Sequence, residues 1–223
     1  MTDTLQAISR SLAADVQTMA TISQNTSNAH TPGYRTTRAT PDFATQAGLH
    51  TTLDQRDGGL MQTTKPLDLA LRGPGFFVVE RAGKLLLTRS GAFRVDQEGT
   101  LVTPAGDRVQ GMSGAVVLGA GEVRVDADGQ LWSGTQNVGQ LQIVSVADAS
   151  AVAAAGDGLY EYRGELASWN GSVVQGALER ANVDAADEML RLMETTRHVE
   201  SVRRAMSTYD QMMDTGINRI GDN

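Results

Sequence analysis

The chain has no cysteine among its 223 residues, which excludes disulfide bonds, thiolate metal sites and cysteine nucleophiles. Aromatic residues make up only 4% of the sequence. No uninterrupted apolar run reaches the roughly 18 residues that a membrane-spanning helix needs. Basic residues are also in deficit, because the net charge is -7, whereas nucleic-acid-binding domains usually carry a basic excess. We therefore expect neither a nucleic-acid partner nor insertion into a lipid bilayer.

The first residues, MTDTLQAISRSLAADVQTMA, lack the pattern of a cleaved signal peptide. Asp3 stands where such peptides carry basic residues, and polar residues interrupt every apolar run. We expect the chain to stay in the cytosol, or to be exported by a route that removes no hydrophobic leader.

Apolar residues near the N-terminus recur every three or four positions, which is the spacing of one face of a helix. They predict a helix from about Thr4 to Asn28, with a stripe made of Leu5, Ile8, Leu12, Val16, Met19 and Ile22. The stripe is narrow, which is typical of helix-on-helix seams rather than of broad globular cores.

The C-terminal region repeats this design. Asp184 can cap a helix, and an acidic Asp187 in the first turn complements the helix dipole. The pattern predicts a helix from about Ala185 to Gly216, and its stripe comprises Met189, Leu192, Thr196, Val199, Val202, Met206, Tyr209, Met213, Ile217 and Ile220. Both helices are longer than ordinary globular helices, so they are expected to pair with each other, with other copies, or both.

Between the helices, residues 66–174 are rich in glycine and in short β-like runs. A hairpin is predicted where Arg81–Gly83 separates two apolar runs. The stretches RVDQEGTLV from Arg94 and RVDADGQLW from Arg124 resemble each other, and each predicts a hairpin whose turn closes on a glycine. GQLQIVSVAD, from residue 139, alternates cleanly and predicts one further strand. The middle is therefore predicted to be an antiparallel β domain.

Three blocks of sequence carry a family resemblance. The first, QNTSNAHTPGY, is similar to N-N-I-A-N-x-x-T-P-G-Y, departs from it at Gln24, Thr26 and Ser27, and keeps Asn25, Asn28, Thr31, Pro32, Gly33 and Tyr34. The second, GGLMQTTKPLDLALRGPGFFVV, keeps Pro66, Leu67, Asp68, Ala70, Gly73, Gly75, Phe76 and Phe77. The third begins GALERANVDAADEML and keeps Gly176, Leu178, Glu179, Asn182, Val183, Glu188, Met189, Arg197, Glu200 and Asp210. In it, Thr196 and Val199 replace the usual glutamine and aromatic.

With these blocks in this order, the chain resembles the axial proteins of the bacterial flagellum, the rod and hook family. The helix–β–helix order indicates an α+β fold. The resemblance implies that the long N- and C-terminal helices pair as a coiled-coil-like tube domain, with an antiparallel all-β middle domain. The expected segments are a helix and turn over 1–34, an extended linker contacting neighbours over 35–58, the β domain over 59–176 and the C-terminal helix over 177–223.

The resemblance also implies the function of a structural subunit of the flagellar basal-body rod. Such a subunit self-assembles helically into the periplasmic drive shaft after type III export, and no signal peptide is cleaved. The implied partners are other copies of the chain, other rod and hook subunits and the type III export apparatus, and no cofactor is implied. The expected assembly interface comprises Leu5, Ile8, Leu12, Val16, Met19, Ile22, Asn25, Asn28, Thr31, Pro32, Gly33, Tyr34, Met189, Leu192, Val199, Met206 and Met213.

The turn that ends the first block has a physical interpretation. Pro32 presets φ, and Gly33 supplies a φ above zero, which suits a tight reversal of the chain. Within the family that the chain resembles, the KPLDLAL block, the compact size and the absence of a long insertion between Tyr34 and Gly59 favour a proximal-rod subunit, and a distal-rod subunit is the next candidate.

An alternative from a different class is a free-standing envelope binding module whose two helices form an intramolecular hairpin. An enzyme is disfavoured. His30, His50 and His198 form no ligand-spaced pair, so no metal site is expected. Neither G-x-S-x-G nor a P-loop occurs, although distant residues can still meet in a hydrolase site. DADG at 126–129 lacks the other acids of a calcium loop and indicates a β-turn.

Overall fold

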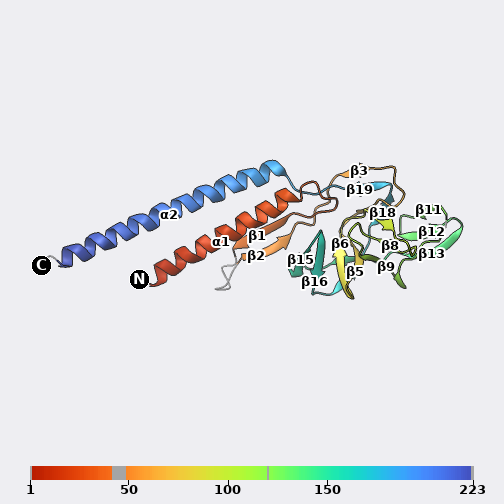
Figure 1. The fold of residues 1–223 in the computed structure, drawn as a ribbon, viewed down its shortest axis with the longest axis horizontal. Coiled ribbons are helices and arrows are strands. Elements are labelled where there is room, and N and C mark those ends of the chain that lie inside the picture. The colour runs from red at the N-terminus through yellow and green to blue at the C-terminus, as the bar shows by residue number, and fades with distance from the viewer. Residues whose placement is uncertain (1, 42–48, 120, 222–223) are drawn as a thin grey trace. The chain divides into compact units, whose positions relative to one another are not determined.

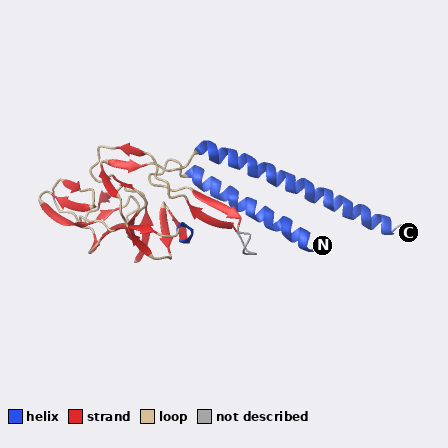
Figure 2. Cartoon of the chain, turned by 180° about the vertical axis from the view of Figure 1, so that it is seen from behind, coloured by secondary structure: helices blue, strands red, loops and turns tan. Residues whose placement is uncertain are grey.

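The computed structural model describes residues 2–41, 49–119 and 121–221. In these residues the chain forms two α-helices, one near each end, with short strands between them (Figures 1 and 2). The chain divides into two compact units. Residues 1–27, 39–50 and 184–223 make up the helical unit, and residues 28–38 and 51–183 make up the β unit.

The helical unit contains α1 (Thr2–Ser27) and α2 (Ala185–Gly221). The two helices lie side by side and antiparallel, so the start of α1 and the end of α2 point the same way (Figures 1 and 2). Asp184 caps α2, because its Oδ1 accepts hydrogen bonds from the backbone N–H groups of Ala186 at 2.9 Å and Asp187 at 3.3 Å. The capping role expected of Asp184 is therefore confirmed. Neither helix has the length and apolarity that crossing a bilayer requires, in the part of the chain that the structure describes.

Polar contacts join the helices in the part of the chain that the structure describes. Asn25 Nδ2 of α1 donates a hydrogen bond to Glu188 Oε2 of α2 at 3.2 Å. About three helical turns further along, His198 Nδ1 lies 2.9 Å from Asp15 Oδ2. The first contact is buried and the second is exposed, so the helix pair is anchored most firmly where α1 ends and α2 begins.

The expected coiled-coil-like tube domain is wrong, although the α+β class is right. A coiled coil buries successive residues of one seam, but Val16 and Met189 of the expected seam are 61% and 60% exposed. The most deeply buried side chains include the polar Asn25 and Glu188, at 1% each. Residues 39–50 also join the helices in the same compact unit. The helices form an open pair because apolar residues are spread around α2 instead of following one stripe.

The largest sheet of the β unit has ten strands. They are β5 (Phe76–Arg81), β6 (Lys84–Thr88), β7 (Arg94–Val95), β8 (Leu101–Val102), β9 (Arg108–Gly111), β10 (Gly114–Ala115), β14 (Ile143–Val146), β15 (Val152–Gly156), β16 (Leu159–Tyr162) and β17 (Leu166–Ser168). The main path is β15-β16-β6-β5-β9-β8-β7, with β10 paired to β9, and β14 paired to both β5 and β17. A short 3-10 helix, η1 (Ala149–Ala151), precedes β15.

Smaller sheets complete the fold. One has the order β11 (Val123–Val125), β12 (Gln130–Ser133) and β13 (Gln136–Gln140), and another pairs β1 (Thr37–Pro41) with β2 (Leu49–Leu53). The other two pair β4 (Leu69–Arg72) with β18 (Ser172–Gln175), and β3 (Leu60–Gln62) with β19 (Ala177–Glu179). In these last two sheets, strands from the beginning and the end of the β unit pair directly, which closes the unit.

The β unit has two apolar cores, one on each side of β5. Successive side chains of a strand point to opposite faces, so Phe77 and Val79 enter one core while Phe76 and Val78 enter the other. The rings of Phe77 and Phe93 meet edge to face at 5.1 Å between centroids. Burial on both faces explains why this segment reads as a continuous apolar run instead of an alternating one.

Most of the predicted turns are confirmed. Ala82 and Gly83 have φ values of 50° and 78°, as a two-residue hairpin loop between β5 and β6 requires. In the two similar stretches, the N–H groups of Gly99 and Gly129 donate to the carbonyls of Asp96 and Asp126, at 3.2 and 2.9 Å. The single strand predicted from residue 139 is wrong, because that segment changes partners and divides into the end of β13 and β14.

Candidate assembly junction

A tight turn over residues 28–34 follows α1. The N–H of Thr31 donates to the carbonyl of Asn28 at 2.9 Å, and the hydroxyl of Thr31 donates to Asn28 Oδ1 at 3.1 Å. The N–H of Tyr34 then donates to the carbonyl of Thr31 at 3.2 Å. Gly33 has a φ of +70°, which confirms the positive φ expected of it.

Gly33 also lies against the chain at Arg89. A Cβ atom at this position would stand 2.4 Å from the carbonyl carbon of Arg89 and 2.5 Å from the nitrogen of Ser90. On its other side, the N–H of Gly33 donates to the carbonyl of Glu179 at 2.7 Å. The glycine is therefore needed for its backbone conformation and also for the close approach of three segments.

We expect Gly33→Ala to lower the free energy of unfolding of the β unit by about 2–4 kcal/mol, from strain at positive φ plus the displacement of a neighbouring backbone. Gly83→Ala is the matched control. Gly83 has a similar φ of +78° but nothing within 4 Å of an added Cβ, so this variant should lose only about 1 kcal/mol. Urea unfolding followed by tryptophan fluorescence measures both changes, and equal losses in the two variants would contradict the role of close packing.

Arg89 is completely buried, with 0% of its side chain exposed. Its Nε donates to Glu179 Oε2, and its Nη1 donates to the carbonyls of Gly73 at 2.7 Å and Gly75 at 2.6 Å. Its Nη2 donates to the carbonyl of Leu71 at 2.8 Å and to Asp57 Oδ1 at 3.0 Å. Every N–H of this guanidinium thus has an acceptor, which is the condition for burying such a group.

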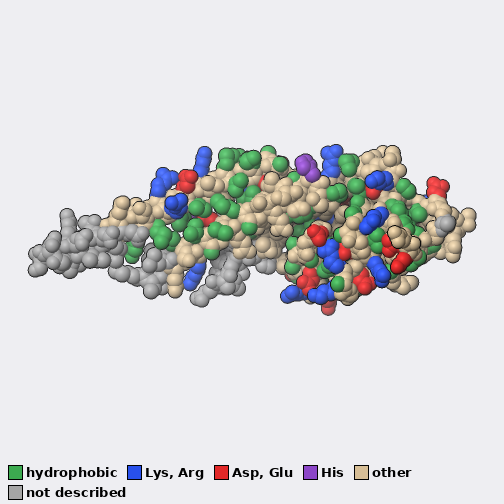
Figure 3. Space-filling view, in the orientation of Figure 1, with side chains coloured by type: hydrophobic (Ala, Val, Ile, Leu, Met, Phe, Trp, Pro, Cys, Tyr) green, Lys and Arg blue, Asp and Glu red, His purple; other side chains and the backbone are tan. Residues whose placement is uncertain are grey.

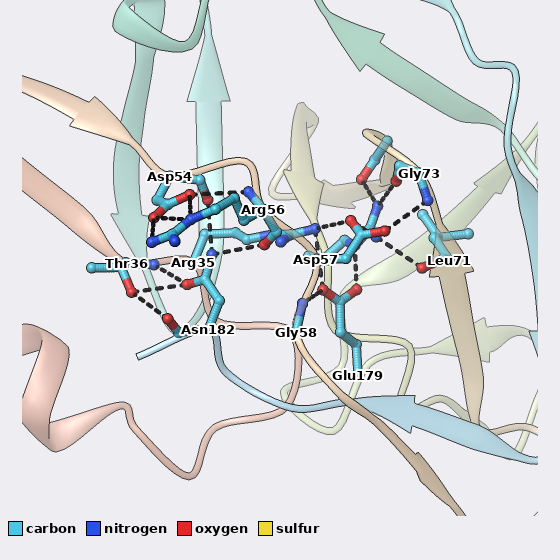
Figure 4. A network of polar contacts seen from close by, with 12 residues as sticks. Arg35, Thr36, Asp54, Arg56, Asp57, Gly58, Leu71, Gly73, Glu179 and Asn182 are labelled. Atoms are coloured by element: carbon cyan, nitrogen blue, oxygen red, sulfur yellow. Dashed lines mark hydrogen bonds and ion pairs between the residues drawn. The ribbon is translucent and has the colours of Figure 1, made fainter. Parts of the chain in front are cut away.

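A second buried arginine, Arg35, shares the same carboxylates. Its Nη2 lies 3.1 Å from both Asp57 Oδ1 and Glu179 Oε1, while Nε and Nη1 have no partner in the described residues. Figure 4 shows Glu179 and Asp57 converging on the end of the Arg35 side chain. Two buried cations therefore depend on one buried carboxylate, Glu179, and on the half-exposed Asp57.

Electrostatics favours the charged form of Asp57. Burial alone would raise its pKa, but the N–H of Gly73 and the guanidinium groups of Arg35 and Arg89 outweigh that effect and hold the pKa below its usual range. Tyr160 lies close by, and its hydroxyl accepts the N–H of Arg35 at 3.1 Å. Burial raises the pKa of Tyr160 to about 12, so it stays neutral beside the arginine.

Beside this ion cluster, Asn182 bonds to the segment before β1 and to the segment after β2. Its Oδ1 accepts the N–H of Thr36 at 2.7 Å and the Thr36 hydroxyl at 2.8 Å. Its Nδ2 donates to the carbonyls of Asp54 at 3.0 Å and Arg56 at 2.8 Å (Figure 4). The backbone N–H of Asn182 donates to the carbonyl of Tyr34 at 3.3 Å. One carboxamide thus satisfies three separate backbone groups.

We define the junction as Gly33, Arg35, Thr36, Asp57, Arg89, Glu179 and Asn182. Its members come from four separate parts of the sequence, and its contacts are hydrogen bonds and ion pairs that hold the backbone in place. No group of three or more potential metal ligands occurs in the described residues. The arrangement is suited to fixing the geometry of a subunit.

Comparison with known proteins agrees with a subunit of this kind. The family model described as "Flagellar hook protein FlgE/F/G D1 domain" matches residues 70–159, and that described as "Flagellar basal body rod FlgEFG protein C-terminal" matches residues 174–220. The flagellar basal-body rod protein FlgF of Caulobacter vibrioides is 31% identical, over 90% of this chain and 90% of its own length. The chain belongs to the flagellar basal-body rod protein family.

Other members of this family give the same result. FlgF of Escherichia coli is 30% identical over 92% of this chain and 94% of its own length. FlgG of Buchnera aphidicola subsp. Schizaphis graminum is 28% identical over 87% of this chain and 91% of its own length. Family members are part of the flagellar basal-body rod, so the rod is the location of this chain and its role there is structural. These relatives are named as rod proteins and not as enzymes.

The structure distributes the expected interface residues over both units. Those of the turn, Gly33 and Tyr34, are buried at the junction, while Asn28, Thr31 and Pro32 are half-buried. In the helical unit, Ile22 and Asn25 are buried and Ile8, Met19 and Val199 are half-buried. The exposed ones are Leu12, Val16, Met189, Leu192 and Met206. Leu5 and Met213 lie outside the residues whose side chains are described.

The first and third family blocks meet at the junction. Gly33 and Tyr34 from the first block bond to Glu179 and Asn182 from the third. Sequence reasoning missed Arg35, Asp57 and Arg89, because a lone arginine or aspartate between strands usually indicates a solvated surface. The available signal was Glu179, an acidic residue in an otherwise apolar short strand, which requires a buried cation as its partner.

Proposed function

We propose that this chain assembles helically, with other copies of itself and with other rod and hook subunits, into the periplasmic drive shaft of the flagellum. The main support is the apolar surface of the helical unit. Val16, Met189 and Leu190 are 61%, 60% and 57% exposed. Apolar side chains gather on the visible surface of the helices (Figure 3), and large exposed apolar patches usually mark interaction sites.

Three parts of the chain have different roles in this proposal. The helices bury their exposed apolar residues against neighbouring subunits. The junction fixes the paths by which the chain enters and leaves the β unit, through the bonds of Gly33 to Glu179 and of Asn182 to Tyr34. Residues 35–58 contact neighbouring subunits. We further propose that the chain arrives through the type III export apparatus without removal of a leader and has no catalytic role.

A proximal position in the rod is favoured over a distal one, because the chain is compact and the connection from Tyr34 to Gly59 is short. Cryo-electron microscopy of hook–basal bodies from the native cell tests the position. Density for the chain next to the membrane-embedded base supports the proximal position, and density next to the hook supports the distal one. Intact basal bodies without the chain would favour a separate binding module, to which the intramolecular contact of Asp15 with His198 is suited.

Changing Met206 to aspartate tests the role of the helices. Met206 is 39% exposed on α2, so a carboxylate there stays hydrated in the free chain. Burying it against a neighbour would cost several kcal/mol, on the order of a hundredfold or more in affinity. We expect the variant to fold normally but to be depleted from purified hook–basal bodies in a strain that lacks the native copy.

Met112→Asp is the matched control, because Met112 is 70% exposed in the turn between β9 and β10 of the β unit. Quantitative mass spectrometry of the purified particles gives the incorporated amount of each variant. Normal incorporation of Met206→Asp would count against burial of this part of α2 in the assembly.

A further inference from the structure

Two methionines of α2 lie on the side that the helix pair leaves uncovered. Glu188, which bonds to Asn25 of α1, and the half-buried Val199 and Val202 mark the covered side. At about 100° per residue, Met189 and Met193 lie about 110–150° around the helix from the centre of that side. They are 60% and 46% exposed, and they are one helical turn apart.

These sulfurs are open to oxidation. The chain contains nine methionines and no cysteine, so thioethers are its only oxidisable sulfur groups. Hydrogen peroxide oxidises a thioether to a sulfoxide. A sulfur lone pair attacks one peroxide oxygen and the O–O bond breaks. The attacked oxygen stays on sulfur, and its proton passes to the departing hydroxide, which leaves as water. The sulfur loses two electrons and the peroxide gains them. The sulfoxide is polar, and thiol-dependent reductases return it to the thioether.

We propose that Met189 and Met193 form a peroxide-sensitive modification site that controls whether the free subunit can dock into the rod. The inference rests on the proposed assembly through the helices. In the reduced state the pair presents a flexible apolar surface, which adapts to differently shaped neighbours. In the oxidised state the same surface carries two strong S=O dipoles that docking would strip of water.

The site acts on assembly and not on the fold of the subunit. Because both side chains project into solvent in the free chain, their sulfoxides stay hydrated and remove no internal packing. The free chain therefore keeps its stability when it is oxidised. A half-buried methionine such as Met19 would instead disturb the helix pair. In subunits already in the rod, Met189 and Met193 are protected from peroxide, since a neighbouring subunit covers them.

The test uses the full-length chain treated with hydrogen peroxide until peptide mapping shows sulfoxide at both positions. Sedimentation velocity over a range of concentrations measures self-assembly, and circular dichroism measures the fold. We expect oxidation to raise the concentration needed for assembly about tenfold or more, with an unchanged circular dichroism spectrum. Treatment with a methionine sulfoxide reductase and thiol should restore the original value.

Two variants make the result specific. Both chains carry Met206→Leu, because Met206 is also exposed on α2 and lies in the proposed interface. In that background, Met189→Leu/Met193→Leu keeps an apolar surface without sulfur and should assemble equally well before and after peroxide, although methionines elsewhere are still oxidised. Met112→Leu removes an exposed sulfur from the β unit and should remain as sensitive as the unaltered chain. Unchanged assembly of the doubly oxidised chain, or persistent sensitivity of the double-leucine variant, would overturn this inference alone. A reduced chain that stays monomeric at every concentration would overturn the proposed self-assembly, and this inference with it.

Discussion

Replacing Glu179 by glutamine is expected to lower the free energy of unfolding of the β unit by about 3–5 kcal/mol, the usual cost of leaving a buried charge without its partner. Glu179 is 1% exposed and contacts both Arg35 and Arg89, whose side chains are 2% and 0% exposed. The variant leaves these two guanidinium groups with Asp57, which is 44% exposed. In the native chain, the N–H of Gly58 donates to Glu179 Oε1 at 2.7 Å. In the variant, the NH2 group of the glutamine faces either an arginine or this N–H, and each of these groups is itself a donor.

Urea unfolding is a direct measurement, because both tryptophans of the chain, Trp132 and Trp169, belong to the β unit. Glu161→Gln is the matched control. The Glu161 carboxylate is 47% exposed and 3.6 Å from Arg163, and exposed pairs of this kind contribute less than about 1 kcal/mol. Similar losses in the two glutamine variants would mean that the buried ion cluster contributes no more to the free energy of unfolding than an exposed ion pair does.

A compensating change tests the same charge balance. Arg35 uses only its Nη2 in the cluster, and its Nε and Nη1 have no partner in the described residues. Arg35→Met combined with Glu179→Gln removes one cation together with the carboxylate. We expect the double variant to regain about 1–2 kcal/mol over Glu179→Gln alone. A further loss of stability would indicate that packing around Arg35 matters more than charge.

Shortening the chain from its C-terminus should have an even larger effect, at a sharply defined position. A chain that ends at Val183 retains β19, Glu179 and Asn182, and we expect its β unit to unfold cooperatively and close to the normal temperature. A chain that ends at Gly176 loses all three. The combined loss is on the order of the whole stability of a small domain, about 5–15 kcal/mol, so this chain should not fold.

The physical reason is that residues at the end of the β unit pair with residues at its beginning. β19 pairs with β3, Glu179 neutralises Arg35 and Arg89, and the Asn182 side chain satisfies backbone groups of Thr36, Asp54 and Arg56. Thermal unfolding of the two chains by circular dichroism, with near-ultraviolet signals from the tryptophans, measures the difference. If the shorter chain melted cooperatively at the same temperature, the junction would not be essential for folding.

The sequence by itself determined the local elements and the family. The spacing of apolar residues predicted α1 and α2 to within a few residues, because a helix repeats its faces at short range. Asp184 predicted a cap, and glycines at 33, 83, 99 and 129 predicted turns, since such features depend only on neighbouring residues. All four glycines have positive φ in the structure. The three family blocks predicted a rod protein, which the relatives confirm.

Only the tertiary structure decided which elements meet. The coiled-coil-like seam was wrong because periodicity does not say which of several apolar positions on α2 is covered, and Met189 is in fact 60% exposed. The junction was missed because its charges are 90 residues apart at Arg89 and Glu179. A sequence shows that a residue is charged, but it does not show whether water or a distant partner compensates the charge. Burial of Arg35, Arg89 and Glu179 is possible only when both ends of the β unit come together, which is a property of the fold and not of any segment.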